Sequence, residues 1–130
     1  NLSNDKEHHQ GVESVQWKPL SEELIEAALL NGKTIFVDVT ADWCITCKLN
    51  DARVFRKKEI ISALNSLDVV ALKGDWSQHS DEITKFLQRR NSATIPFNQI
   101  YGKDNEQGIM LPPLLNSKTV LEKINEAKGI

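Results

Sequence analysis

The segment "TIFVDVTADWCITCK" (residues 34–48) decides the fold. Its first part, "TIFVDVTA" (34–41), is a β-branched and nearly continuous apolar run, as expected of a strand covered on both faces. The run leads directly to Cys44 and Cys47, the only two cysteines of the chain. A strand that turns at once into a helix at Cys44 places this cysteine at the helix N-terminus.

This position predicts thiol chemistry. Unpaired backbone N–H groups and the helix dipole favour an anion at a helix N-terminus and act to lower the pKa of the Cys44 thiol. Nearby acidic residues act to raise this pKa, so the sequence leaves the net shift open. Cys47 returns to the same helix face, within the roughly 4.4–6.8 Å Cα separation that a disulfide tolerates. An outer thiolate can then attack a disulfide, and an inner thiol can release the product.

A stabilising role and a metal-binding role fit the cysteine pair less well. A disulfide that closes so short a loop restricts the unfolded chain little, so it adds little stability. A C-x-x-C pair is also half of a zinc site, but zinc requires three or four protein ligands. The three histidines supply no second half: His8 and His9 lie in a polar start, and His79 is expected at the surface. The pattern therefore favours redox chemistry with no metal and no cofactor.

Length and charge exclude several classes of protein. The 130 residues fit one domain, and the net charge of −2 gives no electrostatic reason for binding nucleic acid or an anionic membrane. No stretch approaches the roughly 20 apolar residues of a membrane span. Residues 1–11 are polar and are expected to form a leader or linker, with the folded domain at 12–130. The start at Asn1 instead of Met fits a processed product or an excised domain.

The remaining elements alternate between strands and helices. Helices are expected to start at caps Ser21, Ser80 and Ser117, and the helix after the cysteines should break near residues 56–58. Strands are expected within 12–17, from residue 68, after Pro96 and at 109–111. The order β-α-β-α-β-α-β-β-α predicts an α/β fold, with a central mixed sheet of parallel strands plus an antiparallel C-terminal hairpin, flanked by helices.

The cysteine segment also resembles a known family. "VDVTADWCITCK", followed about fifty residues later by "TIP", is similar to the thioredoxin superfamily. The pattern D-x-x-A-D-W-C-x-x-C-K resembles the C-terminal domains of the DsbD family of thiol:disulfide interchange proteins. The likeness covers roughly residues 12–127 and implies the thioredoxin fold.

This resemblance implies roles for individual residues. Cys44 becomes the exposed nucleophile and Cys47 the resolving thiol. Ile95 and Pro96 match the loop in which a cis proline packs against the sulfurs, and with Trp43 they would contact a partner's extended segment. Without the resemblance, Pro96 is a simple strand-start proline.

Two acidic residues match further positions of the family. Asp38 lies where the superfamily keeps a buried acid below the inner cysteine, and burial would raise its pKa so that it exchanges a proton with Cys47. Otherwise it is an edge aspartate satisfied by solvent. Asp51 matches a second acidic position of the DsbD C-terminal domain, or is a solvated helix residue. Trp76 and Tyr101 are expected to be packing residues.

The resemblance implies a protein-disulfide reductase that relays reducing equivalents to other thiol proteins through transient mixed disulfides. It further implies a periplasmic location and a link to an inner-membrane electron-transfer segment. The alternatives are a free-standing cytosolic thioredoxin and a redox-inert binding module. Ile45 and Thr46 offer no cation to a thiolate, so a reducing poise is expected. Pro112 and Pro113 depart from the family and leave the shape of the partner groove open.

Overall fold

A computed structural model describes residues 14–130, and the expected leader at 1–11 lies outside these residues. Five strands form one sheet, with the order β1-β3-β2-β4-β5. They are β1 (Lys18–Pro19), β2 (Thr34–Thr40), β3 (Val69–Asp75), β4 (Phe97–Gly102) and β5 (Asn105–Met110). β1 and β2 run parallel to β3, whereas β4 is antiparallel to both β2 and β5. The predicted mixed sheet with an antiparallel C-terminal hairpin is confirmed.

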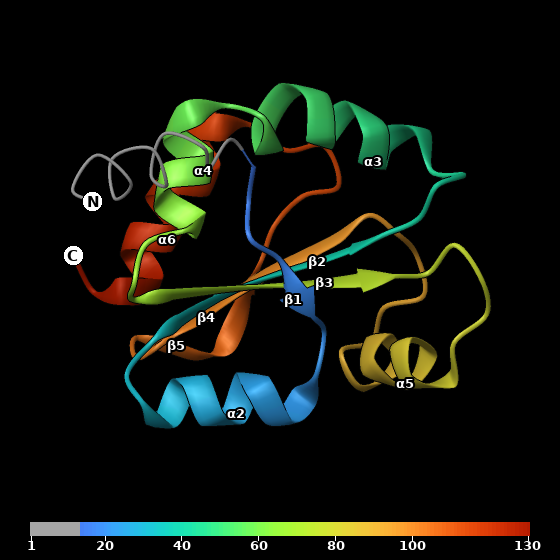
Figure 1. The fold of residues 1–130 in the computed structure, drawn as a ribbon. Coiled ribbons are helices and arrows are strands. Elements are labelled where there is room, and N and C mark those ends of the chain that lie inside the picture. Colours follow the sequence, from blue (N-terminus) through green and yellow to red (C-terminus); the bar gives the residue numbers. More distant parts are fainter. Residues whose placement is uncertain (1–13) are drawn as a thin grey trace, which may run out of the picture.

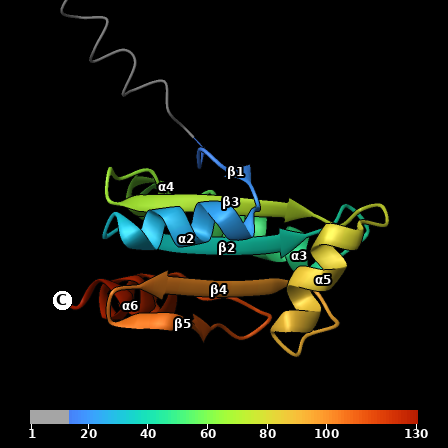
Figure 2. The same cartoon turned by 90° about the horizontal axis from the view of Figure 1, so that it is seen from below.

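Helices cover both faces of this sheet. Figure 1 shows α3 (Ile45–Asn50), α4 (Lys58–Leu64) and α6 (Ser117–Lys128) above the strands, and α2 (Glu22–Leu30) and α5 (Asp81–Arg89) below them. Figure 2 looks up through α2 and α5 onto the sheet. β2 serves both layers because successive side chains point to opposite faces: Phe36 enters the upper core, while Ile35 and Val37 enter the lower one.

The predicted break in the helix after the cysteines is confirmed. α3 continues as a π-helical turn, η1 (Asp51–Phe55), and α4 starts at Lys58. Asn50, which is 2% exposed, lies at the junction of α3 and η1. Its side chain donates to the Pro113 carbonyl (2.8 Å) and accepts from the Leu115 N–H (2.9 Å). The Asn50 side chain thus fixes the segment Pro113–Leu115 against α3, the helix that carries Cys47.

The first predicted strand is wrong in position. Within the described residues the strand covers Lys18–Pro19, not 12–17. The preceding backbone pairs with a side chain, since Gln16 N–H donates to Asn65 Oδ1 (2.8 Å) and Asn65 Nδ2 donates to the Ser14 carbonyl (3.0 Å). Trp17 packs edge-on against Phe55, with the ring centroids 5.3 Å apart.

Two other boundaries differ from the prediction. β5 starts at Asn105 instead of 109, because Asn105 already pairs with Gly102 across a tight turn. The first residues of β5 are polar and lie on an edge strand. α6 is capped by Asn116, whose side chain accepts from the Thr119 N–H, and not by Ser117. The caps Ser21 and Ser80 are confirmed.

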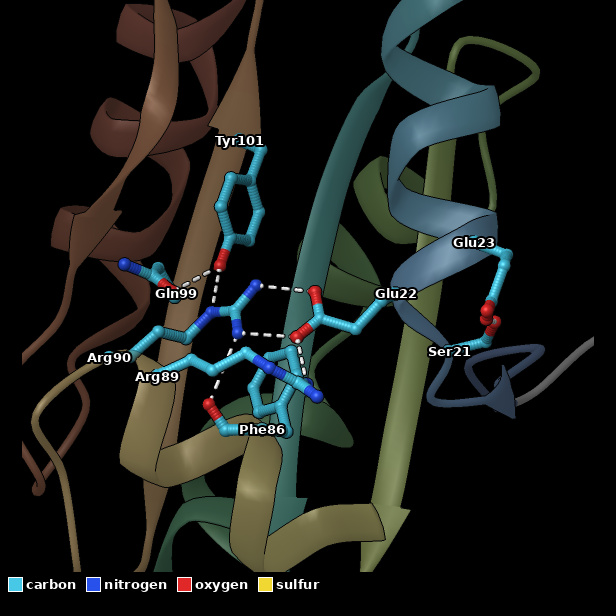
Figure 3. Close-up of polar contacts among 8 residues, drawn as sticks. All are labelled: Ser21, Glu22, Glu23, Phe86, Arg89, Arg90, Gln99 and Tyr101. Carbon is cyan, nitrogen blue, oxygen red and sulfur yellow. Dashed lines mark hydrogen bonds and ion pairs between the residues drawn. The ribbon is translucent and has the colours of Figure 1, made fainter.

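A polar cluster joins α2, α5 and β4 below the sheet (Figure 3). The Arg90 guanidinium donates to both carboxylate oxygens of Glu22 (2.8 Å each) and to the Tyr101 hydroxyl (2.6 Å), and it lies over the Phe86 ring. The Tyr101 hydroxyl donates in turn to Gln99 Oε1. The ion pairs with Arg90 and Arg89 lower the pKa of Glu22. Tyr101, 4% exposed, is a packing residue as predicted.

Candidate functional site

The turn between β2 and α3 holds the two cysteines. Cys44 is the N-cap of α3, with extended backbone angles, and its Sγ accepts a hydrogen bond from the Cys47 N–H (3.2 Å). A sulfur in this position faces the free amides of the first helical turn, where negative charge is stabilised. The predicted placement of Cys44 at the helix N-terminus is confirmed.

The two sulfurs form a disulfide, and the Cα atoms lie 5.3 Å apart. Cys44 is 7% exposed and Cys47 is 6% exposed, so residue burial does not separate an outer from an inner sulfur in this oxidised state. Their surroundings differ instead. Cys44 lies between Trp43 and Ile45, which are 60% and 76% exposed, whereas Cys47 lines a cavity that opens to solvent.

The Ile95–Pro96 segment lies beside the disulfide. The Ile95–Pro96 peptide bond is cis, and Ile95 packs against the cluster of Ala41, Cys44 and Cys47. On the neighbouring surface, Trp43 lines a shallow hollow of about 440 Å³ together with Trp76, His79 and Ala93. His79 is exposed as predicted and pairs with Asp81 (2.7 Å).

Asp38 is buried in the middle of the sheet, with only 5% of its surface exposed, which excludes an edge position. In the strand register it lies opposite Lys73 of β3 and Asn98 of β4. Its pKa is raised to about 6, mainly by burial. The hydrogen bond from Asn98 and the charge of Lys73 act to lower this pKa, and the charge of Asp51 acts to raise it. At neutral pH this carboxyl group can therefore exist in both protonation states.

A cavity of about 540 Å³ connects Asp38 with Cys47. Asp51 and Lys73 also line it, together with Arg56. Asp51 is half-exposed and pairs with Arg56 (3.0 Å), so it contributes to the electrostatics of the cavity while remaining a solvated helix residue. A carboxyl group and a cysteine on one cavity can exchange a proton directly or through water.

Two residues of this site were not assigned from the sequence. Lys73 is the one charged residue inside the run "VVALKG", and Asn98 is a polar residue in the strand after Pro96. Both signals are visible as polar interruptions of buried strands. Their common partner, Asp38, becomes evident only from the register.

Comparison with known proteins places the sequence in a family. The model of a family described as Thioredoxin-like matches residues 16–103, which is more than half of the chain. The chain belongs to the thioredoxin-like family. Within residues 14–130, the helices of this thioredoxin-like chain are all too short or too polar to cross a bilayer. In that same part, no three or more His, Cys, Asp or Glu side chains gather in a group that could hold a metal ion.

Curated relatives agree with the family resemblance predicted from the sequence. The thioredoxin-like chain is 28% identical over 125 residues to the thiol:disulfide interchange protein DsbD of Ralstonia nicotianae, covering 92% of this chain and 20% of that protein. It is 27% identical over 103 residues to DsbD of Campylobacter jejuni, covering 79% of this chain and 18% of that protein. The chain thus spans about a fifth of the length of these relatives.

Solved structures agree on the thioredoxin fold. The oxidised C-terminal domain of Neisseria meningitidis DsbD superposes with a TM-score of 0.66 at 19% identity, covering 82% of this chain and 91% of that domain. A thioredoxin from Thermus thermophilus also gives a TM-score of 0.66, at 15% identity, covering 87% of this chain and 86% of that protein. Identities this low establish the fold alone.

Proposed function

We propose that this chain is a thiol–disulfide oxidoreductase domain that acts through Cys44 and Cys47. The observation that carries the proposal is the N-cap position of Cys44, with a disulfide to Cys47 and a hydrogen bond from the Cys47 N–H to its sulfur. The same amides can stabilise a Cys44 thiolate in the reduced state.

In the proposed reaction the reduced pair transfers two electrons to a partner disulfide. The Cys44 thiolate attacks one partner sulfur, a mixed disulfide forms and the other partner sulfur leaves as a thiolate. Asp38 takes the proton of Cys47, and the Cys47 thiolate attacks Cys44 Sγ. The second partner sulfur leaves, the Cys44–Cys47 disulfide forms, and the released thiolates take protons from solvent.

The partner would bind at the apolar side chains that surround the disulfide. Trp43 and Ile45 flank Cys44 and are largely exposed, and Ile95 precedes Pro96 beside the sulfurs. An extended partner segment would pair with the Ile95 backbone and place its own sulfur against Cys44, a form of strand addition. Trp43, Ile95 and Pro96 are thus the proposed partner-binding residues.

The direction of transfer is proposed from the relatives and from local charge. The DsbD proteins that this chain resembles are named thiol:disulfide interchange proteins. We infer a reductase that takes electrons from an inner-membrane segment of the same or an associated protein and passes them to periplasmic thiol proteins. Ile45 and Thr46 bring no cation to the Cys44 thiolate, which favours a potential nearer that of thioredoxin, roughly −270 mV, than the roughly −120 mV of the oxidant DsbA.

Reduction of insulin by dithiothreitol tests the exchange activity. The wild-type domain should accelerate it, and Cys44→Ser should remove the acceleration. Activity independent of Cys44, or none in the wild type, would favour a redox-inert binding module. Equilibration with glutathione buffers measures the potential, and a value close to that of an oxidant would reject the reducing direction.

A further inference from the structure

Asn98 lies next to the buried carboxyl group and has an incomplete set of hydrogen bonds. It is 1% exposed and faces Asp38 across the β2–β4 pair. Its Nδ2 donates to Asp38 Oδ1 (2.8 Å) and to the Val37 carbonyl (3.3 Å). Its Oδ1 is buried and has no hydrogen-bond partner among residues 14–130.

The unpaired Oδ1 of Asn98 destabilises the fold unless the hydrogen bonds that Nδ2 donates compensate for it. A buried oxygen without a donor costs free energy, and an apolar side chain of similar size would avoid this cost. The next residue of β4 on the same sheet face is Ile100, which is fully buried in the apolar core. The specific contribution of Asn98 is therefore the N–H group that it donates to Asp38.

Several charged groups surround the same carboxyl group. Lys73 faces Asp38 from β3, and Asp51 and Arg56 face the shared cavity from η1 and its end. The other titratable groups that line the cavity lie on α3, on β3 and in the β2–α3 turn; they are Cys47, Lys48, Asp75 and Asp42. Of these neighbours within residues 14–130, Asn98 is the one that donates a hydrogen bond to Asp38.

We propose that Asn98 is a positioning residue of the exchange reaction. Its Nδ2 holds Oδ1 of Asp38 and keeps the Asp38 carboxyl group ionised and ready to accept the proton of Cys47. This inference rests on the proposed function. In this step the Cys47 proton goes to the Asp38 carboxylate, whose Oδ1 accepts the hydrogen bond from Asn98. The S–H bond breaks, an O–H bond forms, and the thiolate attacks Cys44 Sγ and displaces the partner thiolate. Asp38 then loses its proton to solvent through the cavity.

Carboxyl ¹³C NMR titration of the oxidised domain tests the contact without any activity. In Asn98→Leu the pKa of Asp38 should rise from about 6 by about one unit, because a hydrogen bond to the charged form is lost. The matched control is Gln99→Leu, which removes the adjacent buried amide on the opposite sheet face and should leave this pKa unchanged. Should Asn98→Leu not fold, Asn98→Val gives the same test. A pKa that stays at about 6 or falls overturns the proposal.

A kinetic measurement tests the role in the reaction. Cys44 is joined to 2-nitro-5-thiobenzoate, and release of this coloured thiol by Cys47 is followed from pH 5 to pH 9. Asn98→Leu should slow release about fivefold at pH 6 and shift the pH midpoint upward, with rates converging at high pH. A purely structural role would lower the stability and leave the midpoint unchanged, which overturns the proposal. If Cys47→Ala released the thiol equally fast, the proposed function would fail, while the titration still decides whether Asn98 controls Asp38.

Discussion

Two carboxylates on opposite faces of one sheet have opposite environments. Above the sheet, Asp38 receives a single hydrogen bond, from a neutral amide, and burial raises its pKa to about 6. Below the sheet, Glu22 binds the Arg90 guanidinium with both oxygens, and this pairing lowers its pKa. The Glu22 cluster joins helices to the sheet, whereas Asp38 remains able to bind and release a proton beside Cys47. The difference separates a group that holds the fold together from one available for chemistry.

The largest effect that we expect within this comparison is a gain of stability in Asp38→Asn. The pKa of about 6 in the folded state lies above the ordinary 3.8, so the folded state holds the proton more tightly. Wild-type stability therefore falls as pH rises from about 4 to 6. The amide introduced by Asp38→Asn would keep an acceptor for Asn98 and avoid the buried charge, which raises the free energy of unfolding at pH 7 by about 3 kcal/mol.

Urea unfolding of the oxidised proteins at pH 4 and pH 7 measures this gain. The gain should be large at pH 7 and nearly absent below pH 4. An equal gain at both pH values would show that it does not come from the ionisation of Asp38.

Glu22→Gln should lower the free energy of unfolding, by less than Asp38→Asn raises it. It leaves the largely buried Arg90 without a counter-charge, and we expect a loss of about 1–2 kcal/mol in the free energy of unfolding at pH 7. Because the pKa of Glu22 is lowered from 4.5, its contribution is present above pH 4.5 and disappears as pH falls through the folded pKa.

The matched control for Glu22→Gln is Glu26→Gln, an exposed carboxylate on the same helix. Chemical denaturation between pH 3 and pH 7 should show a loss for Glu22→Gln and almost none for Glu26→Gln. Equal losses would mean that Glu22 stabilises the fold through general helix charge and not through Arg90. The disulfide-exchange rate should be unchanged in both variants.

The smallest effect is expected from Asp51→Asn. Asp51 raises the pKa of Asp38 through its charge alone, across a cavity that it shares with Arg56. Its removal should lower the pKa of Asp38 by less than about one unit, because half-exposed charges are screened. Carboxyl NMR measures the shift, with Asp81→Asn as a remote control. A rise in the pKa, or a shift as large as that expected for Asn98→Leu, would contradict this assignment.

Local patterns predicted the fold and the position of the cysteines. The apolar run of β2, the caps Ser21 and Ser80 and the helix start at Cys44 depend on residues close in sequence, and the structure confirms them. The missed boundaries depend on distant partners. β1 lies later than predicted because Asn65, far along the chain, binds the backbone before it. The start of β5 is not predictable from a local pattern, because its polar edge residues show no apolar alternation.

The environment of Asp38 could be predicted only in part. Its position within an apolar strand indicated burial, and the structure confirms this. Its partners Lys73 and Asn98 could not be predicted, because a shift of one residue in strand register turns every side chain to the other face. A register fixed by the whole sheet therefore determines which polar residues meet at the site.

Capture of a disulfide-containing protein by Cys47→Ala tests the central claim most directly. Without the resolving thiol, the reaction should stop at a mixed disulfide through Cys44. Mass spectrometry should find a one-to-one adduct with insulin that dithiothreitol releases, and Cys44→Ala should form none. Failure of Cys47→Ala to form the adduct, or equal capture by Cys44→Ala, would contradict the claim that Cys44 attacks and Cys47 resolves.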